Sequence, residues 1–157
     1  MTDNRNSGGA VGQFTADLVG AATAGAYDEV ADALGVLTRA GSPHVPAEIA
    51  GELVGRCASL VRARHPADPG SIFTIVVADD QARPVEVDRL PPGPLAALRA
   101  LLAALGDDEA SRDIQVELAT RGEPEDVVAV VIHLLVWLVE LSDSSAAALP
   151  SLSCFTP

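Results

Sequence analysis

The run VVAVVIHLLVWLVEL, residues 127–141, constrains the fold of this chain more than any other stretch. Its uninterrupted apolar part, from Val127 to Val139, is shorter than the ~20 apolar residues that a membrane-spanning helix needs. Acidic residues precede the run and no basic residue follows it, so the usual anchors at a membrane surface are missing. We therefore expect a helix in the core or at an interface, in a protein that has no membrane partner.

One polar edge interrupts this helix. Because a helix returns to nearly the same direction after seven residues, Asp126, His133 and Glu140 share one stripe, with Trp137 beside them. Successive members of the stripe lie about 10 Å apart along the axis, which is too far for one metal ion to bind them all. We predict no metal site here and interpret His133 as an edge residue with a local hydrogen bond. A ligand pocket near His133 and Trp137 is the alternative.

The rest of the chain divides into short elements. A length of 157 residues is typical of one domain. We expect a disordered lead-in over 1–13, a single domain over 14–142 and a flexible tail over 143–157. Apolar spacing and the positions of glycine and proline predict helices over 14–40, 46–64, 94–105 and 127–142, and leave a break near 24–26 open. Residues 113–119 fit either a strand or a helix, and the acidic start and Arg-Gly end of their segment favour the helix.

Two segments have the character of strands. SIFTIVVAD is rich in β-branched residues and PVEVDRL alternates apolar and polar residues, which predicts a β-hairpin over 72–78 and 84–89. The first strand is apolar on both faces, so we expect it to have a further neighbour. The predicted fold class is mainly α (α+β): a compact domain of about five helices with one β-hairpin, in the order α-α-β-β-α-α-α.

Charge restricts the partners. The net charge is −12, and residues 107–157 hold ten acidic residues against two arginines. Nucleic acid and the cytoplasmic membrane surface are themselves negative, so we expect neither as a partner. A basic protein suits this surface better, although acidity that simply maintains solubility also explains it. The candidate partner-binding residues bracket the 109–121 segment: Asp107, Asp108, Glu109, Glu123, Glu125 and Asp126. They would form a single patch if the 107–126 segment folded back on itself.

The cysteines, the remaining histidines and the glycine-containing segments indicate no metal site and no cofactor site. Cys57 falls on the apolar stripe of the 46–64 helix and Cys154 lies in the tail, so we expect two reduced thiols and a cytoplasmic protein. His44 and His65 lie in loops, and neither belongs to a set of residues with metal-ligand spacing. No phosphate-binding or cofactor motif is present, and we predict no cofactor. All ten basic residues are arginine, which suggests a bacterial genome of high GC content.

These observations favour a binding protein over an enzyme. The segments 72–78, 94–105 and 127–141 have too few polar residues for a full water-facing side, and a small domain has room for about one such helix at its centre. We therefore expect a homo-oligomer, most simply a dimer. The predicted function is that of a non-enzymatic accessory or adaptor protein that binds another protein. The alternatives are a small-molecule-binding protein or enzyme with its pocket near His133 and Trp137, and a subunit of a larger assembly.

Overall fold

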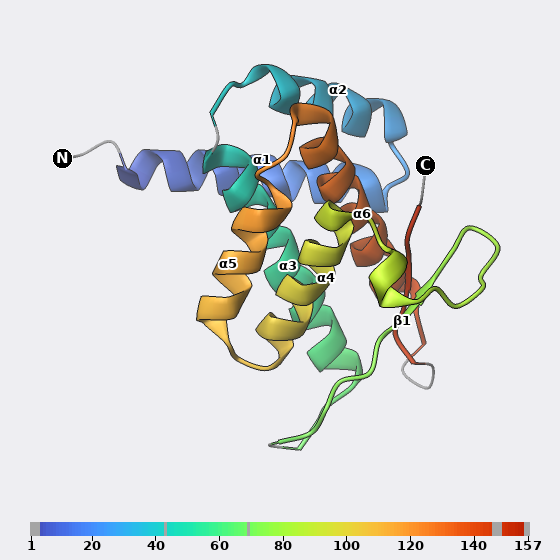
Figure 1. The fold of residues 1–157 in the computed structure, drawn as a ribbon. Helices are drawn as coiled ribbons and strands as arrows, with labels where there is room; N and C mark the ends of the chain where they lie inside the picture. The colour runs from blue at the N-terminus through green and yellow to red at the C-terminus, as the bar shows by residue number, and fades with distance from the viewer. Residues whose placement is uncertain (1–3, 43, 69, 146–148, 156–157) are drawn as a thin grey trace.

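The computed structural model describes residues 4–42, 44–68, 70–145 and 149–155. Its elements, in chain order, are α1 (Asn4–Thr23), α2 (Tyr27–Arg39), α3 (His44–Arg64), β1 (Val76–Ala78), the 3-10 helix η1 (Val87–Arg89), α4 (Pro92–Leu105), α5 (Glu109–Ala119), α6 (Pro124–Asp143) and β2 (Ser151–Ser153) (Figure 1). The prediction of a mainly helical fold is confirmed. Among the described residues, no helix has both the length and the hydropathy needed to cross a bilayer.

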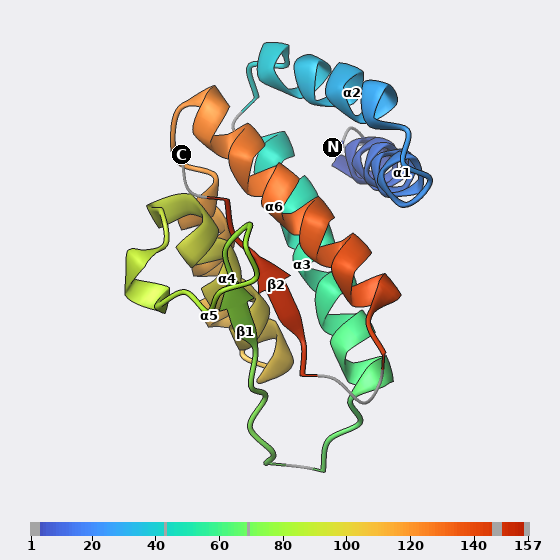
Figure 2. The same ribbon diagram turned by 90° about the vertical axis from the view of Figure 1, so that its right-hand side faces the viewer.

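The core lies around α6. This helix crosses the molecule between α3 and β2 (Figure 2) and also packs against α4. Val130, Val131, Leu134 and Trp137 are each 0% exposed, whereas Ile132, on another side of the helix, is 37% exposed. The predicted apolar helix of residues 127–142 is thus the centre of the domain, and it is buried within a single chain.

Single residues at the helix ends explain where several helices begin and end. The break between α1 and α2 falls at residues 24–26, where Gly25 adopts a φ of 71° that favours glycine. Asp108 caps α5, since its carboxylate accepts a hydrogen bond from the backbone N–H of Ser111 at 3.0 Å. The segment 113–119 is helical, as the acidic start and the Arg-Gly end of its segment favoured.

The predicted hairpin is wrong. β1 pairs with β2 in parallel, in the register Val76↔Ser151 and Ala78↔Ser153. Residues 84–89 turn back toward β1 but make only a single antiparallel bridge, between Ala78 and Pro84. Proline has no N–H to donate to a ladder, and the chain then enters η1 instead of continuing as a strand. The further neighbour expected for the first strand is the chain's own C-terminal segment.

Both ends of the chain differ from the disordered segments expected there. Residues 4–13 belong to α1, whereas the part of the predicted lead-in at 1–3 lies outside the described residues. In the predicted tail, 143–157, Leu152 of the strand β2 is 0% exposed and Cys154, which follows the strand, is 1% exposed. Residues 146–148 and 156–157 of that tail also lie outside the described residues. A short alternation of apolar and polar residues is enough for a strand when one face meets a core.

Candidate functional site

His133 is buried, with 5% of its surface exposed, and both of its ring nitrogens meet the backbone. Nδ1 lies 2.7 Å from the carbonyl oxygen of Ala129, and Nε2 lies 3.2 Å from the backbone nitrogen of Phe155. A carbonyl can only accept a hydrogen bond and an N–H can only donate one. The ring is therefore the neutral tautomer that carries its proton on Nδ1 and accepts at Nε2.

Two more side chains on the same edge of α6 bind the same segment. The indole N–H of Trp137 donates to the carbonyl oxygen of Ser153 at 2.7 Å. Glu140 accepts the backbone N–H of Ser153 at 2.9 Å through one oxygen and the Ser153 hydroxyl through the other. The edge predicted from the seven-residue spacing thus holds the C-terminal segment.

These contacts complete the small sheet. On the side of β2 that faces β1, Cys154 donates its N–H to Ala78, and the carbonyl of Pro150 accepts from Val76. On its other side, the side chains of α6 satisfy the N–H and C=O of Ser153 and the N–H of Phe155. They stand in for a third strand, so this edge of β2 is covered.

The surroundings of His133 are not those of a reactive centre. The Cys154 sulfur lies 3.7 Å from Nε2, but burial raises the pKa of this thiol, which keeps it in the protonated and unreactive form. Neither His133 nor Trp137 lines the groove between α3 and α5 that is described below, or the shallower one between α3 and the end of α6. In that part of the chain, no group of three or more His, Cys, Asp or Glu side chains is arranged to hold a metal ion.

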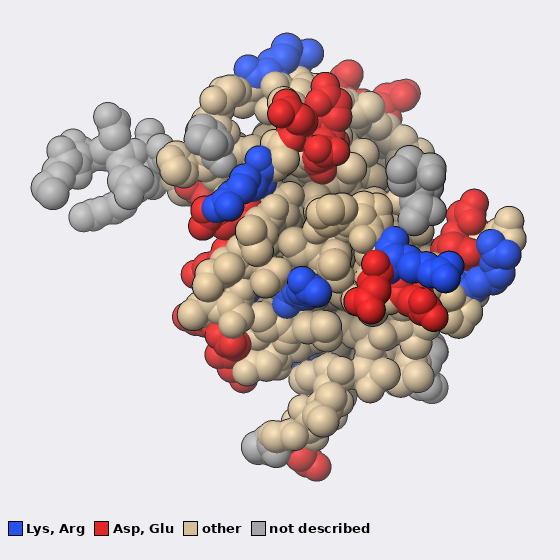
Figure 3. Space-filling model, viewed as in Figure 1, with Lys and Arg blue, Asp and Glu red and all other residues tan. Residues whose placement is uncertain are grey.

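The six acidic candidates do not form one patch. Asp107, Asp108 and Glu109 lie at the start of α5, whereas Glu123, Glu125 and Asp126 lie beyond its other end, at the start of α6. An α5 of 11 residues separates the two groups by about 16 Å. Asp107 also forms an ion pair with Arg62 at 2.7 Å. Figure 3 accordingly shows acidic side chains in several separate groups on the face it presents.

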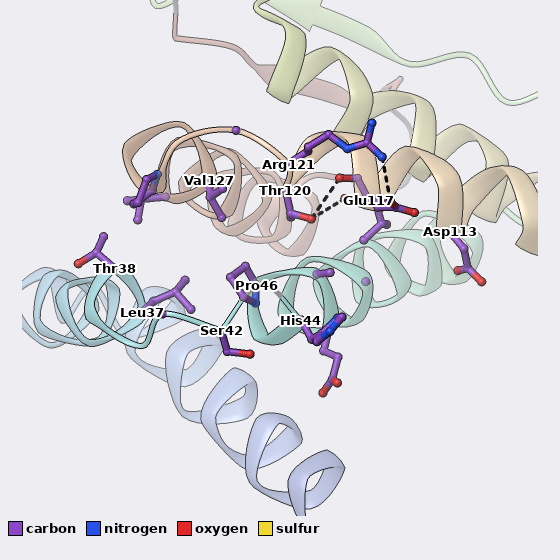
Figure 4. Close-up of a pocket in the computed structure, with 18 residues that line it drawn as sticks. Leu37, Thr38, Ser42, His44, Pro46, Asp113, Glu117, Thr120, Arg121 and Val127 are labelled. Atoms are coloured by element: carbon purple, nitrogen blue, oxygen red, sulfur yellow. Dashed lines mark hydrogen bonds and ion pairs between the residues drawn. The ribbon is translucent and has the colours of Figure 1, made fainter. Parts of the chain in front are cut away.

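A groove of about 1020 Å³ lies beside α5, and none of the six acidic candidates lines it. The end of α2 and the start of α3 form one wall, and α5 with the start of α6 forms the other (Figure 4). Its lining includes the buried apolar side chains of Leu37, Val116 and Val127. The charged lining residues include Glu48 on α3 and Asp113 and Glu117 on α5. Arg121, which follows α5, also lines the groove and pairs with Glu117 at 2.9 Å. The groove therefore combines an apolar part with more acidic than basic side chains.

Two large aliphatic side chains are exposed on α5, the helix that forms one wall of the groove. Ile114 is 57% exposed and Leu118, one turn further on, is 46% exposed. Their i, i+4 spacing with Ala110 is visible in the sequence and indicates a helix, but it does not tell which side of the helix faces the core. In the structure, Val116 and Ala119 of α5 are buried instead.

The geometry leaves two distinct features. One is the edge of His133, Trp137 and Glu140, which is bound to the chain's own C-terminal segment. The other is the outer surface of α5 with the groove beside it. No family model matches this chain, and no curated protein or solved structure matches it either.

Proposed function

We propose that this protein is a non-enzymatic adaptor that binds another protein through α5 and the adjoining groove. The observation that carries the proposal is the exposure of Ile114 and Leu118 on a helix that borders a groove with buried apolar lining. A single exposed aliphatic side chain is common on protein surfaces. Ile114 and Leu118 lie one turn apart on α5, outside the lining of the groove, and together form a small exposed apolar patch.

The charges around the groove favour a basic partner. Glu48, Asp113 and Glu117 line it, and the one lining arginine is paired with Glu117. The acidic start of α6 adds further negative charge at one end. A partner segment that combines apolar and positively charged side chains would match this surface, and an amphipathic helix laid along α5 is the simplest such segment. Because exposed charges are screened by salt, capture of this partner should weaken as ionic strength rises.

A second copy of the chain is the competing occupant of this surface. The expectation of a homodimer rested on three segments with few polar residues, 72–78, 94–105 and 127–141. Of these, the two that form α4 and α6 bury most of their apolar residues within one chain. A homodimer would have to use a different surface, and α5 offers one. The heterologous partner is the better match because a second copy of this acidic chain would bring further negative charge to the groove.

The alternative of a small-molecule site or enzyme at His133 and Trp137 has less support. Both side chains are buried and hydrogen-bonded to the chain's own backbone. A cytoplasmic location, expected from the two unpaired cysteines, remains a prediction.

Affinity capture with the full-length chain in its native host tests the proposed function. The decisive bait carries Ile114→Asp with Leu118→Asp, and a second bait carries Asp113→Asn with Glu117→Gln. Ile72→Asp is the matched control, because Ile72 is 92% exposed but lies outside α5 and the groove. We expect wild type and the Ile72→Asp control to capture the same defined protein. The variant with Ile114→Asp and Leu118→Asp should lose it. The variant with Asp113→Asn and Glu117→Gln should capture it more weakly and with less dependence on salt. The same proteins at the same levels on all four baits would contradict the proposal.

A further inference from the structure

The attachment of the C-terminal segment depends on the protonation state of His133. Nδ1 of this ring already carries its proton toward Ala129, so a second proton can bind only at Nε2. Nε2 is the atom that accepts the N–H of Phe155 at 3.2 Å. Once protonated, Nε2 would present a donor to a donor, and this hydrogen bond would be lost.

The groups that contact the His133 ring carry no negative charge that would balance a protonated ring. Its nearest partners are the neutral thiol of Cys154 and the rings of Trp137 and Phe155, whose centroids lie 6.2 and 5.7 Å from that of the histidine. Glu140, two turns further along α6, is engaged by Ser153. Among the described residues, no ion pair includes His133. A buried cation without a partner is costly, so the charged ring would favour a state in which water reaches it.

The charged groups named below, on the other elements around α6, either bind partners other than His133 or are exposed to water. From α3, Arg64 donates to the carbonyl of Ser142 near the end of α6, and the Cys57 thiol contacts Leu134 with a pKa that burial raises to about 12. The charged side chains of α1, α2 and α4 are exposed; in the described part of the chain they are Asp17, Asp28, Glu29, Asp32, Arg39 and Arg99. The turn after β1 uses Asp79 to bind Arg83.

We propose that Ser153–Phe155 forms a pH-controlled latch, which protonation of His133 releases from α6. In the closed state, Cys154 is buried and Trp137 and Glu140 bind Ser153. In the open state, the Cys154 thiol and the indole of Trp137 become accessible to water. Histidine is the side chain whose charge ordinarily changes between about pH 5 and about pH 8, and this sets the pH range of the test.

The full-length chain contains its own reporters of this opening. Trp137 is the only tryptophan, and Cys154 and Cys57 are the only cysteines. The experiment lowers the pH from about 8 to about 5 and follows Trp137 emission, together with alkylation of each cysteine by mass spectrometry, normalised to a free cysteine peptide at each pH. We expect a red shift of the emission and about a tenfold rise in normalised Cys154 alkylation, the change in equilibrium that the loss of one hydrogen bond produces. Cys57, in the core of α3, stays unmodified and so reports that the domain remains folded.

Two variants and one spectroscopic signal assign the response. His133→Gln offers an amide oxygen to Phe155 but no titrating ring, so it should stay closed over the whole range. His44→Gln makes the same substitution at an exposed histidine and should respond like wild type. In the unaltered chain, the ring resonances of His133 should titrate in step with Cys154 alkylation, a readout that does not depend on any variant folding. Protection of Cys154 down to about pH 5, an unchanged response in His133→Gln, or alkylation of Cys57 in step with Cys154 would each overturn the latch.

Discussion

The indole nitrogen of Trp137 donates a hydrogen bond to the carbonyl oxygen of Ser153 at a distance of 2.7 Å. This bond joins the central helix α6 to the last strand of the chain. Trp137 is fully buried, and its indole supplies the carbonyl of Ser153 with a partner on the edge of β2 that faces away from β1. The C-terminal segment is therefore a part of the core, and substitutions in its contacts should change the free energy of unfolding of the whole protein.

Replacing Trp137 by phenylalanine tests this bond. Trp137→Phe leaves an aromatic ring in place but removes the donor to Ser153, and a buried group that loses its partner costs about 1–3 kcal/mol. We expect the free energy of unfolding, measured by urea denaturation, to fall by that amount. Tyr27→Phe is the control, because Tyr27 is 77% exposed and its change should stay within about 0.5 kcal/mol. An unchanged stability in Trp137→Phe would show that the bond contributes nothing net.

Alanine substitutions at two leucines test how much the packing of β2 contributes to stability. Leu152 is 0% exposed, whereas Leu149, three residues earlier, is 63% exposed. Leu152→Ala should lower the free energy of unfolding by about 2–5 kcal/mol, the usual cost of truncating a buried leucine. Leu149→Ala should change it by less than about 0.5 kcal/mol. Equal and small effects of the two substitutions would mean that the segment is loosely attached.

Two glycines should respond in opposite directions to the same substitution. A Cβ added at Gly93 would lie 2.7 Å from a methyl group of Val130, whereas one added at Gly55 in α3 would meet nothing within 4 Å. Gly93→Ala should destabilise the protein by about 1–3 kcal/mol because it overpacks the contact between α4 and α6. Gly55→Ala should stabilise it by about 0.5–1 kcal/mol through helix propensity. Adding Val130→Ala to Gly93→Ala should relieve the overpacking, and a double variant no better than additive would contradict this explanation.

The cap of α5 should make stability depend on acid pH. Hydrogen bonds from Ser111 hold the pKa of Asp108 below the ordinary value of 3.8. The unfolded chain therefore binds a proton at a higher pH than the folded one, so this stabilisation is present above the ordinary pKa and is lost as pH falls through the folded-state pKa. Thermal melts should show that the advantage of wild type over Asp108→Ala shrinks in acid. Asp108→Asn keeps a capping oxygen without the titration, and its advantage over Asp108→Ala should not vary with pH.

The sequence predicts the helices well because their signals are local. Gly25, the prolines at 92 and 124 and the aspartate at 108 each act through their own backbone or side chain, and the apolar periodicity of α3 and α6 repeats over several turns. The stripe that joins His133 to Glu140 is also local, since it follows from seven residues of helix. Its position on one edge of α6 could therefore be predicted correctly.

The partners of these elements could not be predicted in the same way. β1 is bound by residues about 75 positions further along the chain, and nothing in the segment SLSC specifies a strand without the core that it meets. The partner of His133 is the N–H of Phe155, a backbone group that every non-proline residue has. Similarly, Ile114 and Leu118 carry the same helical spacing whether their side of α5 faces the core or water. The packing of α5 through Val116 and Ala119 decides between the two.

Site-specific photo-crosslinking in the native host tests the central claim, that the exposed side of α5 binds a partner protein. A photoreactive residue replaces Leu118 in one strain and Leu149, which is exposed outside α5, in the other. The account predicts a covalent adduct with one defined protein from position 118 and none from position 149. Absence of any adduct at 118, the same adducts at both positions, or an adduct with a second copy of this chain alone would contradict it.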